Sequence, residues 1–227
     1  MKTFAALLLS LLFIPCSYAQ QQATAPENVT AVVDSFHDSL ESLRARFGNR
    51  PKSDIAKSLV KTTDYVNFLD KLFRAGTPFP QEYLEGITLD ADLLKKLAAQ
   101  ESSTAAQRTN LYEGLKEVES DLALKVSGPR DGNGNVARVV RVIVRAKKGD
   151  QELSAYEVWY VPKGWAKEQT AFKRFDGLTN PSNPPSMNLA PGNYLIWLTK
   201  DQAVTARQPL SLGADSVDRR EIDVPVP

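Results

Sequence analysis

The amino-acid sequence changes character near residue 126, and this change constrains the fold more than any other feature. Before it, glycine and proline are scarce and apolar residues recur at helical spacing. After it come nine of the fourteen prolines and eight of the twelve glycines, with alternating runs rich in valine, tyrosine and tryptophan. Long helices followed by short strands are typical of an α+β chain. We therefore predict a helical, coiled-coil-like domain over residues 20–126 and a β-sandwich domain over residues 127–227.

Two helices are predicted at the start of the helical domain. The first has an apolar seam whose members are alternately four and three residues apart: Val29, Val33, Phe36, Leu40, Leu43 and Phe47. The second repeats this rhythm with Ile55, Leu59, Thr62, Val66, Leu69 and Phe73. A mean spacing of 3.5 residues keeps one stripe facing a partner helix, as in antiparallel bundles. Tyr65, Phe68 and Leu72 form a second apolar face, so the second helix should lie between two neighbours.

A third helical segment is predicted over residues 88–122, and its middle is polar. Its seam is apolar at Leu94, Leu97, Leu111, Leu115, Val118 and Leu122, but polar at Glu101, Thr104 and Arg108. Residues 101–104 are therefore either a break or a stretch that projects beyond the shorter helices. The whole region is expected to form a helical hairpin or a three-helix bundle.

Strands are predicted throughout the C-terminal region. A turn at residues 131–135 precedes an alternating run that places Val140, Val142, Val144 and Ala146 on one face. We expect the next strand over residues 153–161, paired with the first as a hairpin. Shorter strands are expected near residues 171–175, 194–199, 204–209 and 220–224. Short strands with frequent turns predict an antiparallel, Ig-like β-sandwich.

One stretch of this region resembles a known family. Residues 189–197 read LAPGNYLIW, a Pro-Gly turn followed by an aromatic-rich strand. This stretch, the start at residues 126–133 and the Pro-containing end at 224–227 are similar to transthyretin-like, or carboxypeptidase regulatory-like, β-sandwiches, so the resemblance implies a prealbumin-like fold. The resemblance implies a scaffold without enzymatic residues of its own. Tyr194 should point its ring inward, where its hydroxyl can hold the turn in place.

The first nineteen residues have the features of a secretory signal peptide. Lys2 precedes an uncharged run of eleven residues, 4–14, and small residues at 17 and 19 precede a cleavage point at Gln20. The apolar run is too short to cross a bilayer. We expect a secreted or periplasmic protein whose cleavage near Ala19 removes Cys16, the only cysteine.

Composition limits the chemistry that this chain can perform. The sequence has 28 basic and 27 acidic residues, so its net charge favours neither nucleic acid nor an anionic membrane as a partner. With His37 as the only histidine, we predict no metal site, no cofactor and no catalytic residue. His37 lies one position off the apolar seam, where a half-exposed helical residue is expected.

Several carboxylates could in principle take part in acid–base chemistry. The pairs Asp90 with Asp92 and Glu113 with Glu117 are interpreted as solvated, charged helix faces. Glu157 lies among aromatic residues and could have a raised pKa. The simpler interpretation is an edge-strand charge or a salt bridge to Arg141 or Arg145.

Two groups of residues are candidates for contact with a ligand or partner. Arg141 and Arg145 belong to a basic cluster, and the halves carry net charges of −3 (residues 20–126) and +3 (residues 127–227). This cluster could pack against the acidic helices or bind an acidic polysaccharide. The second group, Trp159, Trp165 and Trp197, could stack on sugars or be covered by the helical domain.

The sequence therefore predicts an exported, non-enzymatic binding or assembly protein of the periplasm or cell surface. Its helices would associate with a protein partner or with a second copy, and the sandwich would be a rigid scaffold. The alternative is a carbohydrate-recognition accessory module that uses exposed aromatic side chains of the sandwich.

Overall fold

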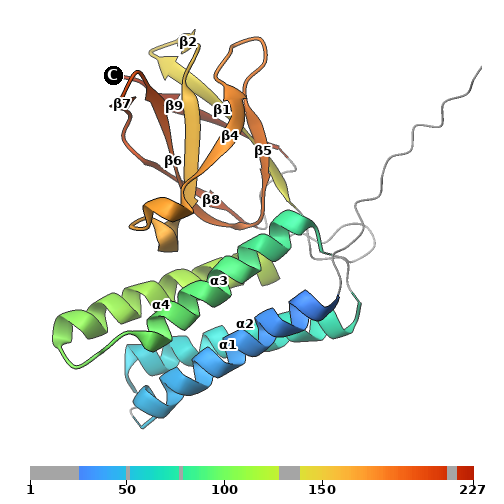
Figure 1. Cartoon of the computed structure of the whole chain (residues 1–227), viewed down its shortest axis with the longest axis vertical. Coiled ribbons are helices and arrows are strands. Elements are labelled where there is room, and N and C mark those ends of the chain that lie inside the picture. Colours follow the sequence, from blue (N-terminus) through green and yellow to red (C-terminus); the bar gives the residue numbers. More distant parts are fainter. Residues whose placement is uncertain (1–25, 50–51, 77–78, 128–138, 214–218) are drawn as a thin grey trace, which may run out of the picture.

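The computed structural model describes residues 26–49, 52–76, 79–127, 139–213 and 219–227. Helices form the first half and strands the second, and the strands stand as a separate layered unit against one side of the helices (Figure 1). The predicted α+β class is confirmed. The signal peptide predicted at residues 1–19 and the turn predicted at 131–135 lie outside the described residues, so both stay predictions.

The helical half is a bundle of four helices: α1 (Pro26–Phe47), α2 (Asp54–Arg74), α3 (Gln81–Ala99) and α4 (Ala105–Val126). The bundle has four helices and not the expected two or three, because the segment predicted as one helix over residues 88–122 breaks at its polar middle into α3 and α4. Thr104 starts α4 with a capping box: its hydroxyl accepts a hydrogen bond from the Gln107 amide at 3.2 Å. The Gln107 side chain accepts one from the Thr104 amide at 2.9 Å.

The apolar seams predicted from sequence form the core of this bundle. Phe36, Leu40, Leu59, Leu94 and Leu115 are all buried. α2 contacts both α1 and α4, which confirms that it lies between two neighbours, and α3 likewise contacts α1 and α4. Burial of one stripe per helix against two neighbours supplies the main apolar driving force for this half.

The strand half contains two sheets, and their strands are β1 (Val140–Lys148), β2 (Gln151–Leu153), β3 (Glu157–Pro162), β4 (Lys173–Leu178), β5 (Ser186–Leu189), β6 (Gly192–Lys200), β7 (Ala203–Val204), β8 (Gln208–Leu212) and β9 (Arg219–Pro225). In the first sheet, β1 pairs with β2 and β5 along one edge and with β9 along the other. In the second, the order is β4, β3, β6, with β7 and β8 both beside β6. The pairing of β9 with β1 is parallel, and all the other pairings in the described residues are antiparallel.

The strand predicted over residues 153–161 is two strands that belong to different sheets, so the predicted long hairpin with β1 is wrong. Of these two strands, only the short β2 pairs with β1, whereas β3 pairs with β4 and β6. The chain changes sheets at Ala155, whose φ of 68° lies in the left-handed region. Its amide donates to the Thr179 carbonyl at 2.8 Å. Local alternation cannot reveal this change, because both strands alternate in the same way.

The core of the sandwich lies between the two sheets. Val140, Val142, Val144 and Ala146 of β1 are buried, as their alternation predicts. Tyr194 also behaves as expected: its ring is 6% exposed and its hydroxyl donates to the Ala190 carbonyl at 2.9 Å. This hydrogen bond fixes the turn that leads into β6.

We predict that Tyr194→Phe lowers the free energy of unfolding by about 1–2 kcal/mol, because the buried Ala190 carbonyl loses its hydrogen-bond donor. Tyr156→Phe is the matched control, since Tyr156 is half-buried against the same core. Urea unfolding of both variants measures the difference. Equal stabilities of the two variants would contradict a role for the Tyr194 hydroxyl.

Candidate functional site

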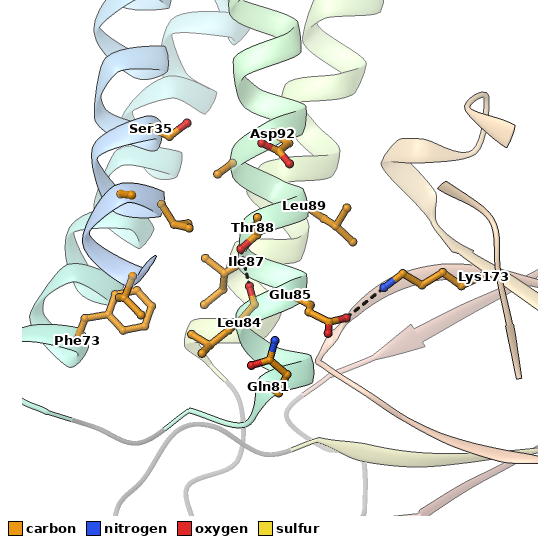
Figure 2. A pocket seen from close by; sticks show the side chains of 14 residues that line it. Ser35, Phe73, Gln81, Leu84, Glu85, Ile87, Thr88, Leu89, Asp92 and Lys173 are labelled. Atoms are coloured by element: carbon orange, nitrogen blue, oxygen red, sulfur yellow. Dashed lines mark hydrogen bonds and ion pairs between the residues drawn. The ribbon is translucent and has the colours of Figure 1, made fainter. Parts of the chain in front are cut away.

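An apolar groove lies between the first turns of α1 and α3. Its volume is about 640 Å³, and its apolar lining includes Val32, Phe73, Leu84, Ile87 and Ala91. Phe73, Leu84 and Ile87 point into the space between the two helices (Figure 2). Val32, Phe73 and Leu84 are only half-buried, so the groove presents apolar surface to solvent.

The outer edge of the groove is polar and reaches the strand half. Glu85 turns away from the groove towards Lys173 of β4, and the two form an ion pair at 3.1 Å (Figure 2). The Thr88 hydroxyl donates to the Leu84 carbonyl at 2.9 Å, within α3. The groove therefore has an apolar floor and a charged border.

A second cavity lies at the junction of the two halves. Its volume is about 480 Å³, and its walls come from α3, α4 and strands β3 to β6. The elements that meet here are packed directly: α4 contacts β6, and α3 contacts β5. Cavities at such junctions are common places for small ligands.

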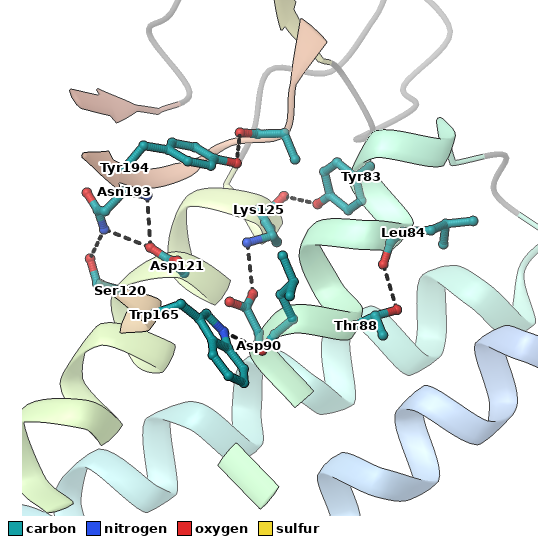
Figure 3. A network of polar contacts seen from close by, with 12 residues as sticks. Tyr83, Leu84, Thr88, Asp90, Ser120, Asp121, Lys125, Trp165, Asn193 and Tyr194 are labelled. Carbon is teal, nitrogen blue, oxygen red and sulfur yellow. Dashed lines mark hydrogen bonds and ion pairs between the residues drawn. The ribbon is translucent and has the colours of Figure 1, made fainter. Parts of the chain in front are cut away.

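The floor of this junction cavity contains a buried ion pair. Lys125 of α4 reaches Asp90 of α3, with Nζ 2.8 Å from Oδ2, and the side chains are only 2% and 7% exposed (Figure 3). Gly86 makes room for the lysine stem, since a Cβ at Gly86 would lie 3.1 Å from Cε of Lys125. The prediction that Asp90 belongs to a solvated face is therefore wrong, because α3 turns Asp90 towards the strands. Asp92, two positions later, is exposed as expected.

A second buried carboxylate ties α4 to the sandwich. Oδ1 of Asp121 accepts hydrogen bonds from the Asn193 backbone amide at 3.0 Å and from Asn193 Nδ2 at 2.8 Å (Figure 3). The same Nδ2 donates to the Ser120 hydroxyl at 3.0 Å. On the helical side, the Tyr83 hydroxyl donates to the Lys125 carbonyl at 2.5 Å. The last turn of α4 is thus held from both halves.

Burial dominates the titration of these groups. It raises the pKa of Asp90 to about 7, an effect that Lys125 opposes and that Asp121 reinforces. Burial also raises the pKa of Asp121, against Lys125 and the two hydrogen bonds from Asn193. Tyr194 has its pKa raised by the same burial. The cluster can therefore take up or release a proton near neutral pH.

Further contacts across the junction use charges of opposite sign. Lys163 pairs with Glu117 at 2.6 Å, and Lys96 of α3 pairs with Glu168. Trp165 donates through Nε1 to the Leu89 carbonyl at 3.2 Å and packs against the helical core. Of the candidate tryptophans, Trp165 is thus the one that the helical half covers.

The two candidate arginines make their contacts inside their own sheet. Arg145 pairs with Glu152 at 2.9 Å and with Glu221 at 3.5 Å. Arg141 donates to the Ser186 hydroxyl at 3.0 Å. Packing of this basic strand against the helices was one of the two hypotheses; the ion pairs to the helices are made instead by Lys163 and Lys173, which follow β3.

The other two tryptophans are neighbours on the outer face of the second sheet, where Trp159 of β3 is opposite Trp197 of β6. Trp197 is only 4% exposed, since Phe172 lies 4.9 Å and Arg207 4.8 Å from its ring. Trp159 is half-buried, with Arg174 at 5.9 Å. The structure therefore does not bring the three tryptophans together.

Glu157 does not have the raised pKa considered from its sequence context. The Thr199 hydroxyl, which donates to it at 3.1 Å, is the main cause that lowers its pKa; Trp159 and Arg174 act in the same direction. Its salt bridge is to Arg174 at 2.5 Å, and not to Arg141 or Arg145. The carboxylate is held ionised, which does not suit a general acid.

No group of three or more histidine, cysteine, aspartate or glutamate side chains in the described ranges could hold a metal ion. None of the helices in this part of the chain combines the length and apolar character that crossing a bilayer requires. His37 is half-buried on α1.

Comparisons with known proteins found no relative: no family model, no curated protein and no solved structure matches this chain.

We predict that stability falls as pH rises from about 4 to 8, and that Asp90→Asn removes much of this dependence. Because the pKa of Asp90 is raised in the folded state, folded protein binds more protons than unfolded protein between about pH 4 and 7. The shift corresponds to roughly 2–4 kcal/mol, present at acid pH and lost above pH 7. In Asp90→Asn, the buried ammonium of Lys125 still has a nearby carboxylate, that of Asp121.

Urea unfolding at several pH values measures this effect, with Asp92→Asn as the control at an exposed site of the same helix. If the curves for the wild type and Asp90→Asn run parallel across this pH range, Asp90 does not titrate as described.

Proposed function

We propose that this chain is an exported, non-enzymatic protein of the periplasm or cell surface that binds or assembles with a protein partner. The observation that carries this proposal is the apolar groove between α1 and α3, with half-buried Val32, Phe73 and Leu84. Export is supported by the signal-peptide features of residues 1–19.

The shape and chemistry of the groove suit an amphipathic helix of the partner. Two helices that leave an apolar furrow between them are a common receptor for a third helix, whose apolar positions fill the furrow. The polar border, with Glu85 and Lys173, would face the polar side of such a helix. A second copy of this chain is one source of that helix, and a different protein is the other.

In this proposal the sandwich is a rigid scaffold of the transthyretin-like kind. Support comes from the Pro-Gly turn before β6 and from the bond between the Tyr194 hydroxyl and the Ala190 carbonyl. The non-enzymatic assignment is supported by Glu157, whose pKa is lowered, and by Asp121, which is engaged with Asn193.

We predict that a photo-crosslinking amino acid at Val32 traps a partner of defined mass in cells of the source organism, whereas the same probe at Val60 does not. Val60 is a matched control because it is a valine on the neighbouring helix α2 and is 58% exposed. Val32→Glu should weaken the association at least tenfold, since a carboxylate would enter an apolar contact.

Light scattering of the purified protein identifies the source of the partner helix. A dimer that Val32→Glu dissociates indicates self-association, and a monomer with a specific crosslink indicates a different protein. Equal crosslinking from Val32 and Val60, or none from Val32, would contradict the groove as a binding surface.

The alternative function is carbohydrate recognition by the outer face of the second sheet. It is favoured by Trp159, a half-buried ring beside Arg174, with half-buried Phe172 nearby on the same face of the sheet. On this alternative, the protein is monomeric, glycans quench its tryptophan fluorescence, and Trp159→Ala abolishes the quenching. Trp165→Phe is the control because Trp165 lies at the junction.

A further inference from the structure

The floor of the junction cavity carries more negative than positive charge. Asp90 and Asp121 are both buried there, at 5% and 6% exposure, beside a single buried ammonium, that of Lys125. Asn193 solvates Asp121 with two hydrogen bonds but brings no charge. One carboxylate therefore has no cation to balance it, and an unbalanced charge at such depth is costly.

Asp90 also has unused capacity to accept a hydrogen bond. Its side chain lines the cavity and is more than nine-tenths buried. The ion pair with Lys125 is the only polar contact of Oδ2, which accepts no well-oriented hydrogen bond from any described residue. A donor that carried positive charge would satisfy both the charge and the acceptor.

The cations at the mouth of the cavity are already paired. Lys173 is bound to Glu85 at 3.1 Å, and Arg174 to Glu157 at 2.5 Å. Neither therefore neutralises the floor. The titratable and charged groups around Asp90, from every element that lines the cavity, are Glu82, Glu85, Asp121, Lys125, Tyr160, Lys173, Arg174 and Tyr194, with Tyr83 close by on α3.

The upper walls of the cavity are largely apolar and aromatic. They include Leu89, Pro162 and Leu189, with the rings of Tyr160 and Tyr194. Aromatic faces and carboxylates together are favourable surroundings for an organic ammonium group. A volume of about 480 Å³ accommodates a small molecule.

We propose that the junction cavity binds a small organic amine, with its ammonium group against Asp90 and Asp121 and its apolar part against Leu89 and the tyrosine rings. The ammonium supplies the missing positive charge, and its N–H groups donate to the carboxylate of Asp90. The apolar part excludes water from the walls.

The titration of Asp90 supports this site. Without a cation, burial raises the pKa of Asp90 to about 7, so a proton balances the charge at acid pH. A bound ammonium replaces that proton. Affinity should therefore rise about tenfold from pH 6 to pH 8, because the ionised fraction of a group with a pKa near 7 increases by that factor.

This site adjoins the partner-binding groove, because Glu85, Leu89 and Lys173 line both, but Asp90 and Asp121 line the cavity and not the groove. Val32 lines the groove and not the cavity, so Val32→Glu should weaken partner association at least tenfold and leave amine binding intact. Failure of one proposal can be told from failure of the other.

Calorimetric titration of the full chain with benzylamine and butylamine at pH 6 and pH 8 tests the proposal. We expect binding of at least one amine, about tenfold tighter at pH 8. Binding at pH 6 should release the proton of Asp90, which shows as a buffer-dependent heat, whereas binding at pH 8 should release almost none. Benzyl alcohol and butanol have nearly the same shapes without the charge, and they should not bind.

Asp90→Asn should abolish amine binding, while Asp64→Asn, at an exposed carboxylate of α2, should leave it unchanged. Asn188→Trp is a second variant, at an exposed residue that lines the cavity, and it should weaken binding without touching the buried cluster. The proposal is overturned if neither amine binds, if the alcohols bind equally well, or if both Asp90→Asn and Asn188→Trp bind like the wild type.

Discussion

The contact between the last turn of α4 and the start of β6 holds the two halves in one arrangement. Asp121 receives both Asn193 donors, and Lys125, one turn later, crosses beneath the strands to Asp90. A buried ammonium with two nearby carboxylates contributes little net stability compared with apolar packing, but it is costly to break. Its effect is to specify one docking position, since any slip would leave a buried charge without its partner.

The other contacts between the helices and the strands depend on this docking position of α4. With α4 fixed, Lys163 reaches Glu117 and Trp165 reaches the Leu89 carbonyl. Exposed ion pairs of this kind contribute at most about 1 kcal/mol each, so they follow the docking geometry and do not determine it. The opposite net charges of the two halves are consistent with this docking, although the residues that carry it are lysines after β3 and not the arginines of β1.

Sequence reasoning succeeded where a pattern is local and repeated. The heptad-like seams of α1 and α2, the alternation of β1 and the Tyr194 turn all depend on residues close together in the chain, and all are confirmed. It failed where the contacting residues are far apart in the sequence. Nothing near residue 155 distinguishes a continuous strand from a change of sheet, and nothing near Asp90 indicates that Lys125 and the strands will cover it. The polar seam at residues 101–108 does not decide between a break and a projecting stretch, although the Thr-x-x-Gln capping box at Thr104 is itself a sequence signal for the start of a helix.

Helix α3 lines both the apolar groove and the junction cavity, with a different face towards each. Leu84, Ile87 and Ala91 follow a spacing of three and four residues and face α1, where they form the groove. Gly86 and Asp90 lie four residues apart on the next face, towards Lys125 and the strands. The first set is apolar because it packs against helices. The second needs a glycine and a carboxylate because it must admit a lysine stem and receive its charge. A single helix therefore provides an apolar wall for the groove and a charged wall for the junction cavity.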